Sequence, residues 1–359
     1  MIRTLGEIAE FVNGHAFKPT DWGDRGKPIV RIQNLTGNSA SFNFTTKVVP
    51  QKYNVERGDI LISWSATLGV FEWFGPSALL NQHIFKMQFN KTKFNKSFLK
   101  HSINAALDSM SNFTHGSTMK HINRNEFLAT KIYCPILEEQ KRIAAILDQA
   151  EELKQKRQRT LDLLEELKQS IFIDMFGDPR ATSQKTRATS IKLGDIIELK
   201  YGFSLPKGSR VSGGVKVFGS NGEVGRHNTS KVDGPALIVG RKGSIGKIHY
   251  SKAPSWPIDT TYYIDESCSD WNLKFLFYLL RYLDLHKMNK AAAIPGLNRN
   301  DVYDLNVMPY SLEKQNLFVE RIEKISNSGN LYLQSQQKLA ELFSSLQHKA
   351  FSGELSGAA

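Results

Sequence analysis

The residues that most resemble known catalytic or phosphate-binding motifs lie in two short stretches in the second half of the chain. The stretch "GRKGSIGKI" at 240–248 resembles a phosphate-binding loop, but its glycines are one residue too far apart, and Ile248 stands where Ser or Thr should follow the Lys. Glu198 and Lys200 form the Glu-x-Lys part of a nuclease carboxylate motif, but Asp195 is too near in sequence to be its usual distant partner. Neither motif is complete, so the sequence predicts no catalytic site.

Histidines and cysteines also lack the spacing of a metal or redox site. The nine histidines include no metal-spaced pair, and Cys134 and Cys268 lie far apart and have no such neighbours. The Asn/Asp-Pro-Pro motif with a final aromatic residue, by which amino-methyltransferases hold a flipped base, is missing as well. We therefore predict that the chain is not an enzyme and has no metal or cofactor of its own.

Both halves of the chain do offer polar side chains on loops between apolar, strand-like runs. Base edges in DNA are read by Arg and Lys at guanine, by Asn and Gln at adenine, and by Ser or Thr at several partners. For any single residue a role in a turn or a solvated loop is as good an explanation, so the prediction concerns the clusters. The candidate DNA-binding residues of the first half are Arg31, Gln33, Asn34, Ser63, Trp64, Ser65, Thr67, Gln82, His83, Ser117 and Lys120. Those of the second half are Ser220, Asn221, Arg241, Lys242, Ser244, Thr260 and Thr261.

These loops belong to a chain that repeats itself. The stretch "NRNEFLATKIYCPILEEQKRI" from residue 123 aligns without a gap with "NRNDVYDLNVMPYSLEKQNLF" from residue 298, and "TLGEIAEFVNGHAF" from residue 4 aligns with "KLGDIIELKYGFSL" from residue 192. The offset falls from 192 − 4 = 188 to 298 − 123 = 175, so the first copy has about a dozen extra residues, which we expect in loops. Each copy begins with short strand-like runs, Gly/Asn/Ser/Pro turns and one late helical patch, which predicts a compact α+β domain.

A long amphipathic helix should follow each domain. Apolar residues recur at three-four spacing from 138 to 176, where no Pro or Gly interrupts the pattern. The second helix has a poorer seam, and "NSGN" at 327–330 should weaken or kink it. We predict that the two helices pair as an antiparallel intramolecular coiled coil; separate amphipathic helices on two cores are the alternative. The predicted helix-pairing residues are Ile143, Ile146, Leu153, Leu164, Leu167, Ile171, Ile325, Leu339, Leu342 and Leu346.

The fold class is thus α+β, with two tandem domains, each followed by a long helix, in a pseudo-twofold internal repeat. The predicted boundaries are 1–137 for the first domain, 138–177 for the central helix, 178–190 for a linker, 191–311 for the second domain, 312–353 for the C-terminal helix and 354–359 for a tail.

The charge of +12 is distributed evenly over the two domains. Residues 1–140 carry 16 basic and 11 acidic side chains and residues 190–315 carry 17 and 12, so each has +5. Two equally basic domains suggest a polyanion held at two places. The N-terminus has no signal peptide, the two cysteines read as reduced thiols, and the most apolar stretch is too short to span a membrane, which predicts a cytoplasmic protein.

Taken together, these features resemble the specificity (S) subunits of type I restriction-modification systems. The resemblance covers essentially the whole chain. It rests on the order domain, helix, domain, helix and on the motifs "GDILIS", "GPALIVGRKGSIGKI", "WPIDTTYYI", "AAIPGLNRNDV", "LEEQKRIAAILD" and "SLEKQ".

The resemblance implies two target-recognition domains that read a split, asymmetric site in double-stranded DNA, without catalysis by this chain. It implies helical regions that dock methyltransferase (M) subunits, about two per chain by the repeat, and motor-nuclease (R) subunits that join for cleavage. S-adenosylmethionine, Mg²⁺ and ATP would belong to those partner subunits. The sequence leaves two other classes open: a DNA nuclease or methyltransferase with degenerate motifs, and a scaffold whose repeat binds protein alone.

Overall fold

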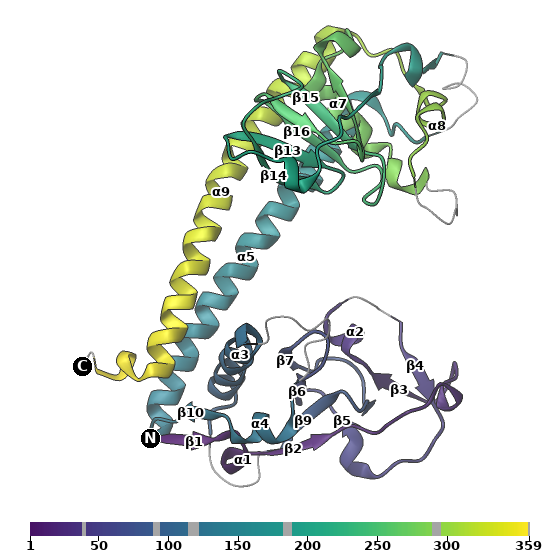
Figure 1. The fold of residues 1–359 in the computed structure, drawn as a ribbon. Coiled ribbons are helices and arrows are strands. Elements are labelled where there is room, and N and C mark those ends of the chain that lie inside the picture. The colour runs from purple at the N-terminus through teal and green to yellow at the C-terminus, as the bar shows by residue number, and fades with distance from the viewer. Residues whose placement is uncertain (38–40, 89–93, 114–121, 182–188, 289–295, 358–359) are drawn as a thin grey trace. The chain divides into compact units, whose positions relative to one another are not determined.

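The computed structural model describes residues 1–37, 41–88, 94–113, 122–181, 189–288 and 296–357. It divides into two compact units, one formed by Met1–Gln158 with Gln334–Ala359 and the other by Arg159–Leu333. Each unit consists of one α+β domain and a segment of each of the two long helices, α5 and α9 (Figure 1).

The first domain has two four-stranded sheets, with strand orders β2-β9-β6-β7 and β4-β3-β8-β5, and a two-stranded ribbon of β1 and β10. Its strands are β1 Ile2–Thr4, β2 Glu10–Asn13, β3 Lys27–Val30, β4 Asn43–Thr45, β5 Asn54–Val55, β6 Ile60–Ser63, β7 Gly69–Glu72, β8 Ala78–Leu80, β9 Ile84–Gln88 and β10 Lys131–Tyr133. Its helices are α1 Leu5–Ile8, α2 Ile32–Leu35, α3 Lys96–Phe113 and α4 Arg124–Ala129, with the 3₁₀ turns η1 Pro19–Asp21 and η2 Gln51–Tyr53.

The second domain repeats this topology with the sheets β12-β18-β15-β16 and β14-β13-β17 and the ribbon of β11 and β19. Its strands are β11 Ile191–Lys192, β12 Lys200–Tyr201, β13 Val215–Gly219, β14 Gly222–His227, β15 Ala236–Gly240, β16 Ile248–Ser251, β17 Ser255–Pro257, β18 Thr261–Asp265 and β19 Asn306–Val307. Its helices are α7 Leu273–Tyr282 and α8 Arg299–Tyr303, with the 3₁₀ turns η3 Leu193–Asp195, η4 Lys207–Ser209, η5 Glu266–Cys268 and η6 Leu285–Met288.

The extra residues of the first copy lie in connections, as the sequence predicts. Twelve residues, 31–42, join β3 to β4, whereas two, 220–221, join the equivalent β13 and β14. The longer connection contains α2. The short strand β5, which pairs antiparallel with β8, corresponds to a single antiparallel bridge between Val232 and Ser255 of β17 in the second domain.

One close backbone approach is common to both domains. Gly14 and Gly202 stand where the chain leaves β2 and β12, and a Cβ atom at either would lie 2.0 Å from Asn81 O or 2.1 Å from Ile258 O. The following residues, His15 and Phe203, form parallel bridges with Asn81 and Ile258. Only glycine fits such an approach, which explains the aligned glycines of the repeat.

The repeated junction from 123 and from 298 builds a buried glutamine clamp in each unit. In the first unit Gln140, 3% exposed, accepts a hydrogen bond from Asn95 N (3.0 Å) and donates one to Pro135 O (2.9 Å). In the second unit Gln315, 1% exposed, accepts from Asn272 N and donates to Tyr310 O, both at 2.9 Å.

The clamp fixes each long helix to its domain. Asn95 and Asn272 also accept hydrogen bonds from backbone N–H groups in the first turns of α3 and α7. Each glutamine therefore ties the start of the domain's own helix to the start of the long helix. This is the structural reason for the repeated Leu-Glu-x-Gln sequence.

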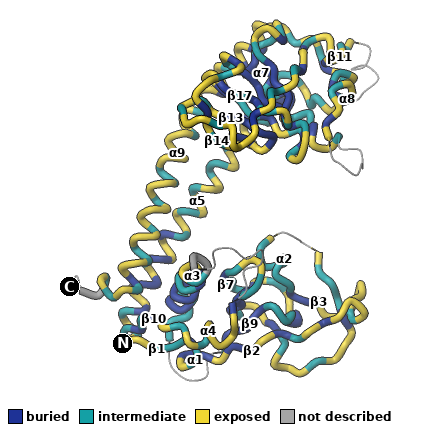
Figure 2. The backbone as a smooth tube through the Cα atoms, in the orientation of Figure 1, coloured by how far each residue is buried: buried dark blue, intermediate teal, exposed yellow. Residues whose placement is uncertain are grey.

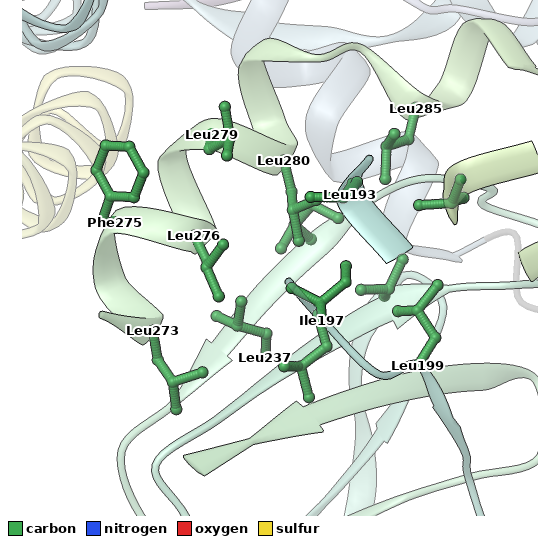
Figure 3. Close-up of a cluster of buried hydrophobic side chains, with 14 of the residues drawn as sticks. Leu193, Ile197, Leu199, Leu237, Leu273, Phe275, Leu276, Leu279, Leu280 and Leu285 are labelled. Atoms are coloured by element: carbon green, nitrogen blue, oxygen red, sulfur yellow. The ribbon is translucent and has the colours of Figure 1, made fainter. Parts of the chain in front are cut away.

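The cores lie between the main sheet of each domain and the helices that cover it (Figure 2). In the second unit, leucines of α7 gather with Leu237 of β15 and with Leu193, Ile197 and Leu199 (Figure 3). Phe172 of α5 adds an aromatic group to this core, stacked on Phe275 with ring centroids 5.7 Å apart. In the first unit Ala350 of α9 is fully buried in the corresponding core.

The long helices are α5 Leu137–Phe176 and α9 Leu312–Ser352. Within the first unit they pair antiparallel. Arg142 donates to Leu355 O (2.7 Å), the Lys154 ammonium lies 5.5 Å from the ring centroid of Phe343, and Gln336 donates to Gln158 (2.8 Å). The partner number falls along α9 as the residue number rises along α5. The second unit shows the same sense, because Leu164 lies beside Gly329 and Phe172 packs on Phe318. The predicted fold class is confirmed.

Two of the six predicted seam residues of α5 are exposed. Ile143 is buried and Leu164, Ile171 and Ile146 are half-buried, but Leu153 and Leu167 are 55% and 46% exposed. A continuous series of buried and half-buried positions with three-four spacing runs 143, 147, 150, 154, 157, 161, 164, 168. The prediction missed this series because two of its positions are lysines, Lys154 and Lys168, which carry a charged side chain. Their aliphatic stems cover the seam while the ammonium groups reach Phe343 and Glu165.

The seam of α9 differs from the prediction at two points. Ile325, Leu339 and Leu346 are half-buried, whereas Leu342 is 59% exposed and Phe343 takes its place. The helix also runs through 327–330 without a break, so the interruption expected there does not occur. Gly329 lies in the seam, where an added Cβ would stand 3.7 Å from Leu164 Cδ1, and this packing offsets the low helix propensity of glycine.

Candidate nucleic-acid interface

In each domain three chain segments that carry candidate residues meet at one place, which we call the polar edge. It is formed by the residues after β3, after β6 and before β9 in the first domain, and by those after β13, after β15 and before β18 in the second. The strand registers impose this meeting, because Val30 pairs with Leu80 and Ser63 with Ile84. The equivalent pairs of the second domain are Phe218 with Pro257 and Gly240 with Thr261.

The candidates of the second domain form one hydrogen-bonded group around Thr260. Its carbonyl oxygen accepts from Arg241 N (3.0 Å), Lys242 N (3.1 Å) and Ser220 Oγ (2.5 Å). Asn221, at the tip of the β13–β14 hairpin, accepts from Ser244 Oγ (3.4 Å). The structure therefore brings these predicted residues together.

Lys247 joins this group, although the sequence analysis did not select it. Its Nζ donates to the side-chain oxygen of Asn221 at 2.6 Å. His249 lies behind the hairpin, 3.3 Å from Ser220 O, and burial lowers its pKa, which keeps the imidazole neutral near pH 7. The Asn221 amide is thus held by neighbours while its residue stays exposed.

Three of the predicted DNA-binding residues are buried. Ser63 and Thr261 are completely buried, and Ser220 is 6% exposed. Their hydroxyl groups donate to Ser65 O, Ile258 O and Thr260 O. A buried hydroxyl group that is already bonded to the backbone stabilises the loop conformation.

The first domain places Trp64, Gln82 and His83 at its polar edge. The Trp64 ring is stacked on Phe85 (centroids 5.5 Å apart) and lies 5.6 Å from His83, whose ring nitrogen Nε2 is 3.3 Å from Gln82 Nε2. His83 Nδ1 is buried and has no hydrogen-bond partner among the described residues. This edge therefore presents aromatic and amide groups where the second domain presents cations.

Arg31 joins the same edge from the end of β3. Its guanidinium donates to Asn43 Oδ1 (3.0 Å) and lies 4.8 Å from the ring centroid of Trp22, while its backbone N–H donates to Asn34 Oδ1 (3.0 Å). Asn34 thus stabilises the turn of α2. Gln33 is half-buried, and Ser65 and Thr67 are half-buried and exposed in the loop after β6. Ser117 and Lys120 lie outside the described residues.

Tyr201 and Arg299 lie beside the second polar edge; Tyr201 was not predicted from the sequence, and Arg299 was included only within the loop 291–300 and not as a single candidate residue. The guanidinium groups of Arg241 and Arg299 lie 4.8 and 5.3 Å from the Tyr201 ring centroid. Burial, and then the neighbouring Tyr201, raise the pKa of Tyr262, whose neutral hydroxyl donates to Leu297 O at 3.0 Å. The sequence signals for Arg299 were its place in the polar loop 291–300 and in the repeated Asn-Arg-Asn.

The two enzyme-like motifs do not form active sites in the described part of the chain. Residues 240–248 connect β15 to β16, so this loop joins two strands and not a strand to a helix as a phosphate-binding loop does. The Lys200 ammonium donates to Ser267 Oγ (2.7 Å) and lies 3.8 Å from Asp265. Within the described residues no group of His, Cys, Asp and Glu could hold a metal ion. A search of the same residues finds no helix long and apolar enough to cross a membrane.

Comparisons with known proteins agree with the fold. The sequence profile of the family "Type I restriction modification DNA specificity domain" matches residues 1–165 and 187–342. The type I restriction enzyme EcoBI specificity subunit from Escherichia coli is 28% identical over 176 residues, which are 47% of this chain and 37% of that protein. The match thus spans well under half of the curated relative.

Two solved structures have a similar fold over nearly their whole length. The S subunit of a type I restriction-modification system from M. genitalium superposes with a TM-score of 0.56 at 16% identity, covering 98% of this chain and 96% of that one. A chain from a study of complex assembly and conformational transition of the type I R-M system gives a TM-score of 0.51 at 16% identity, with 98% and 97% covered.

Proposed function

Because this chain belongs to the family of type I restriction-modification DNA specificity proteins, we propose that it reads a split, asymmetric site in double-stranded DNA. The first domain contacts one half-site through its polar edge and the second domain contacts the other. The helices α5 and α9 set the number of unspecified base pairs between the halves. Proteins of this family confer DNA specificity and are not catalysts, in agreement with the prediction from the sequence.

The observation that carries this proposal is the contrast between a shared frame and two unlike polar edges. Trp64 and Arg241 occupy equivalent positions, because their carbonyl oxygens accept hydrogen bonds from the equivalent residues Ile122 and Leu297. His83 and Thr260 likewise stand just before β9 and β18. Two readers with one frame and different contact groups fit a site with two unequal halves.

We further propose that the helices dock methyltransferase subunits. Apolar side chains on them are exposed in the chain by itself, among them Leu153, Leu163 and Leu167 of α5 and Leu331 and Leu342 of α9. Exposed apolar groups of this kind are typical of surfaces that a partner covers. The repeat supplies two equivalent docking places, hence about two methyltransferase subunits per chain.

The partners supply the chemistry in this proposal. The methyltransferase subunits bind S-adenosylmethionine, and motor-nuclease subunits with Mg²⁺ and ATP join for cleavage. The complex works on DNA in the cytoplasm. The domain boundaries predicted from the sequence, which run from the first domain at 1–137 to the tail at 354–359, are part of this proposal.

Selection from a random duplex library tests this function. This chain, bound to its methyltransferase subunits, is incubated with the library at moderate salt, and the retained duplexes are sequenced. The proposal predicts two short unequal motifs around a gap of constant length. One continuous or palindromic motif would contradict it, and salt-independent retention without any motif would favour a protein-binding scaffold.

A further inference from the structure

The second domain contains a pocket of about 350 Å³ beside its polar edge. The residues that line it come from β12, from the start of the β15–β16 loop, from β18 and from the segment at the start of α8. They are Tyr201, Arg241, Lys242, Tyr262, Gly296, Leu297, Asn298, Arg299 and Asn300.

Backbone contacts hold the walls of this pocket together. Lys242 and Gly296 form an antiparallel bridge, and Leu297 N donates to Arg241 O at 2.8 Å. The buried Tyr262 hydroxyl group donates to Leu297 O at 3.0 Å. The pocket therefore has a built shape that does not depend on exposed side chains alone.

The pocket concentrates positive charge on one aromatic platform. The Arg241 guanidinium lies over Tyr201 and Tyr262, at 4.8 and 5.7 Å from the ring centroids, and that of Arg299 lies over Tyr201 and Tyr303, at 5.3 and 5.9 Å. The exposed Lys242 adds a third cation. None of the described residues that line the pocket is acidic.

Such a cluster favours an anion with several acceptor oxygens. Two guanidinium groups beside the same ring repel one another unless a negative charge lies between them. The N–H groups on the edge of each guanidinium suit a phosphate, because phosphate oxygens accept paired hydrogen bonds. Arg241 donates one N–H to Asp259 O (3.2 Å) and also hydrogen-bonds with the Tyr262 side chain, and the remaining guanidinium N–H groups can donate to a ligand.

Among the described residues of the first domain, which do not include 114–121, no such cluster lies at the equivalent place. Trp64 stands where the second domain has Arg241, and Phe85 stands where it has Tyr262. Arg124, the counterpart of Arg299 in the repeat, donates instead to Phe11 O at 3.2 Å. The cationic pocket is thus a property of the second domain and not of the shared frame.

We propose that this pocket binds a phosphodiester group of the DNA backbone beside the half-site read by the second domain. The proposal rests on the proposed function. The sequence predicted Arg241 as a possible base contact. Here Arg241, Arg299 and Lys242 contact the phosphodiester backbone of the DNA instead. These side chains then anchor the domain on the duplex, and Asn221 and Ser244 remain for base recognition.

Replacement of Arg299 by Gln tests the pocket. Affinity of the complex with methyltransferase subunits is measured for its selected duplex and for an unrelated duplex from 50 to 200 mM salt. Loss of one phosphate contact lowers affinity about three- to tenfold on both duplexes and reduces the slope of log K against log salt by about one. The sequence recovered from a random library stays the same.

Arg281→Gln is the matched control. Arg281 also lies over an aromatic ring, 5.2 Å from the Phe277 centroid, but its charge is beside Glu165 at 3.6 Å and outside the pocket. This variant keeps the wild-type slope. If Arg299→Gln does not fold, as judged by circular dichroism, the exposed Lys242→Gln variant is measured in its place with the same expected slope change.

Two results overturn the pocket assignment. An unchanged slope in the pocket variant means that no phosphate is held there, and a changed half-site sequence means that the pocket reads a base. Failure of the proposed function looks different, because then the wild-type complex itself shows no selected motif.

Discussion

The two domains share a frame and differ at the polar edge. The sheet orders, the glycine at the end of β2 and β12, and the glutamine clamp of Gln140 and Gln315 are common to both. At equivalent edge positions, however, Trp64 is stacked on a phenylalanine, whereas the Arg241 guanidinium lies over two tyrosine rings. The two domains thus keep the same sheet order, glycine and clamp while they differ in the side chains of the polar edge, the groups that we propose to read DNA.

The largest expected effect comes from the shared glycines. Gly14→Ala and Gly202→Ala each force a Cβ to within about 2 Å of a backbone oxygen, at Asn81 and Ile258. Neither backbone segment can yield without breaking sheet hydrogen bonds, so we expect a loss of about 3 kcal/mol or more of unfolding free energy in the affected unit.

Urea unfolding of the full chain measures this loss. Gly208→Ala is the control, because an added Cβ there meets nothing within 4 Å, and it should change stability by less than about 0.5 kcal/mol. If only one of the two glycine variants were destabilised, Gly14 and Gly202 would not have the same structural role in the two domains.

The glutamine clamps should give the next largest effect. Gln140→Leu or Gln315→Leu leaves a buried N–H and a buried carbonyl group without a partner, at a cost of about 2–4 kcal/mol. The two values should be similar, since each clamp makes the same two hydrogen bonds. Thermal unfolding compares them with Gln149→Leu, an exposed position on α5 that should be near neutral. Unequal losses in the two clamp variants would show that the junctions are not equivalent.

Insertion of one heptad into both helices should leave stability nearly unchanged and alter only the spacer. Seven residues are inserted between Leu153 and Leu164 of α5, and seven between Gly329 and Leu339 of α9, which keeps the three-four register of both. The added length of about 10 Å corresponds to about three base pairs. Library selection should recover both half-sites around a longer gap. If the half-site sequences changed, the helices would not determine the gap alone, and their role would not be separate from that of the polar edges.

The fold could be predicted from the sequence because the same pattern of elements occurs in both copies of the repeat. Aligned motifs such as Leu-Glu-x-Gln mark frame positions, and their period revealed two domains and two helices. The helix register was harder, because Lys154 and Lys168 occupy seam positions that polarity assigns to solvent. Apolarity alone favoured Leu153 and Leu167, which are exposed.

The candidate site was predictable as clusters and not as single residues. The strand registers that unite Ser220, Arg241 and Thr260 depend on long-range pairing. Residue type also cannot tell an exposed amide such as Asn221 from a buried hydroxyl such as Thr261. Tyr201 was missed because its importance comes from two arginines that lie 40 and 98 positions away in sequence (241 − 201 and 299 − 201).

Library selection with one variant in each domain tests the central claim most directly. Gln82→Ala alters the first polar edge and Asn221→Ala the second, and each should relax one or two base positions by about 1–3 kcal/mol of discrimination. We predict that Gln82→Ala changes only one half of the recovered site, that Asn221→Ala changes only the other half, and that the gap stays constant. If either substitution altered both halves, or if both altered the same half, the two domains would not be independent readers of a split site.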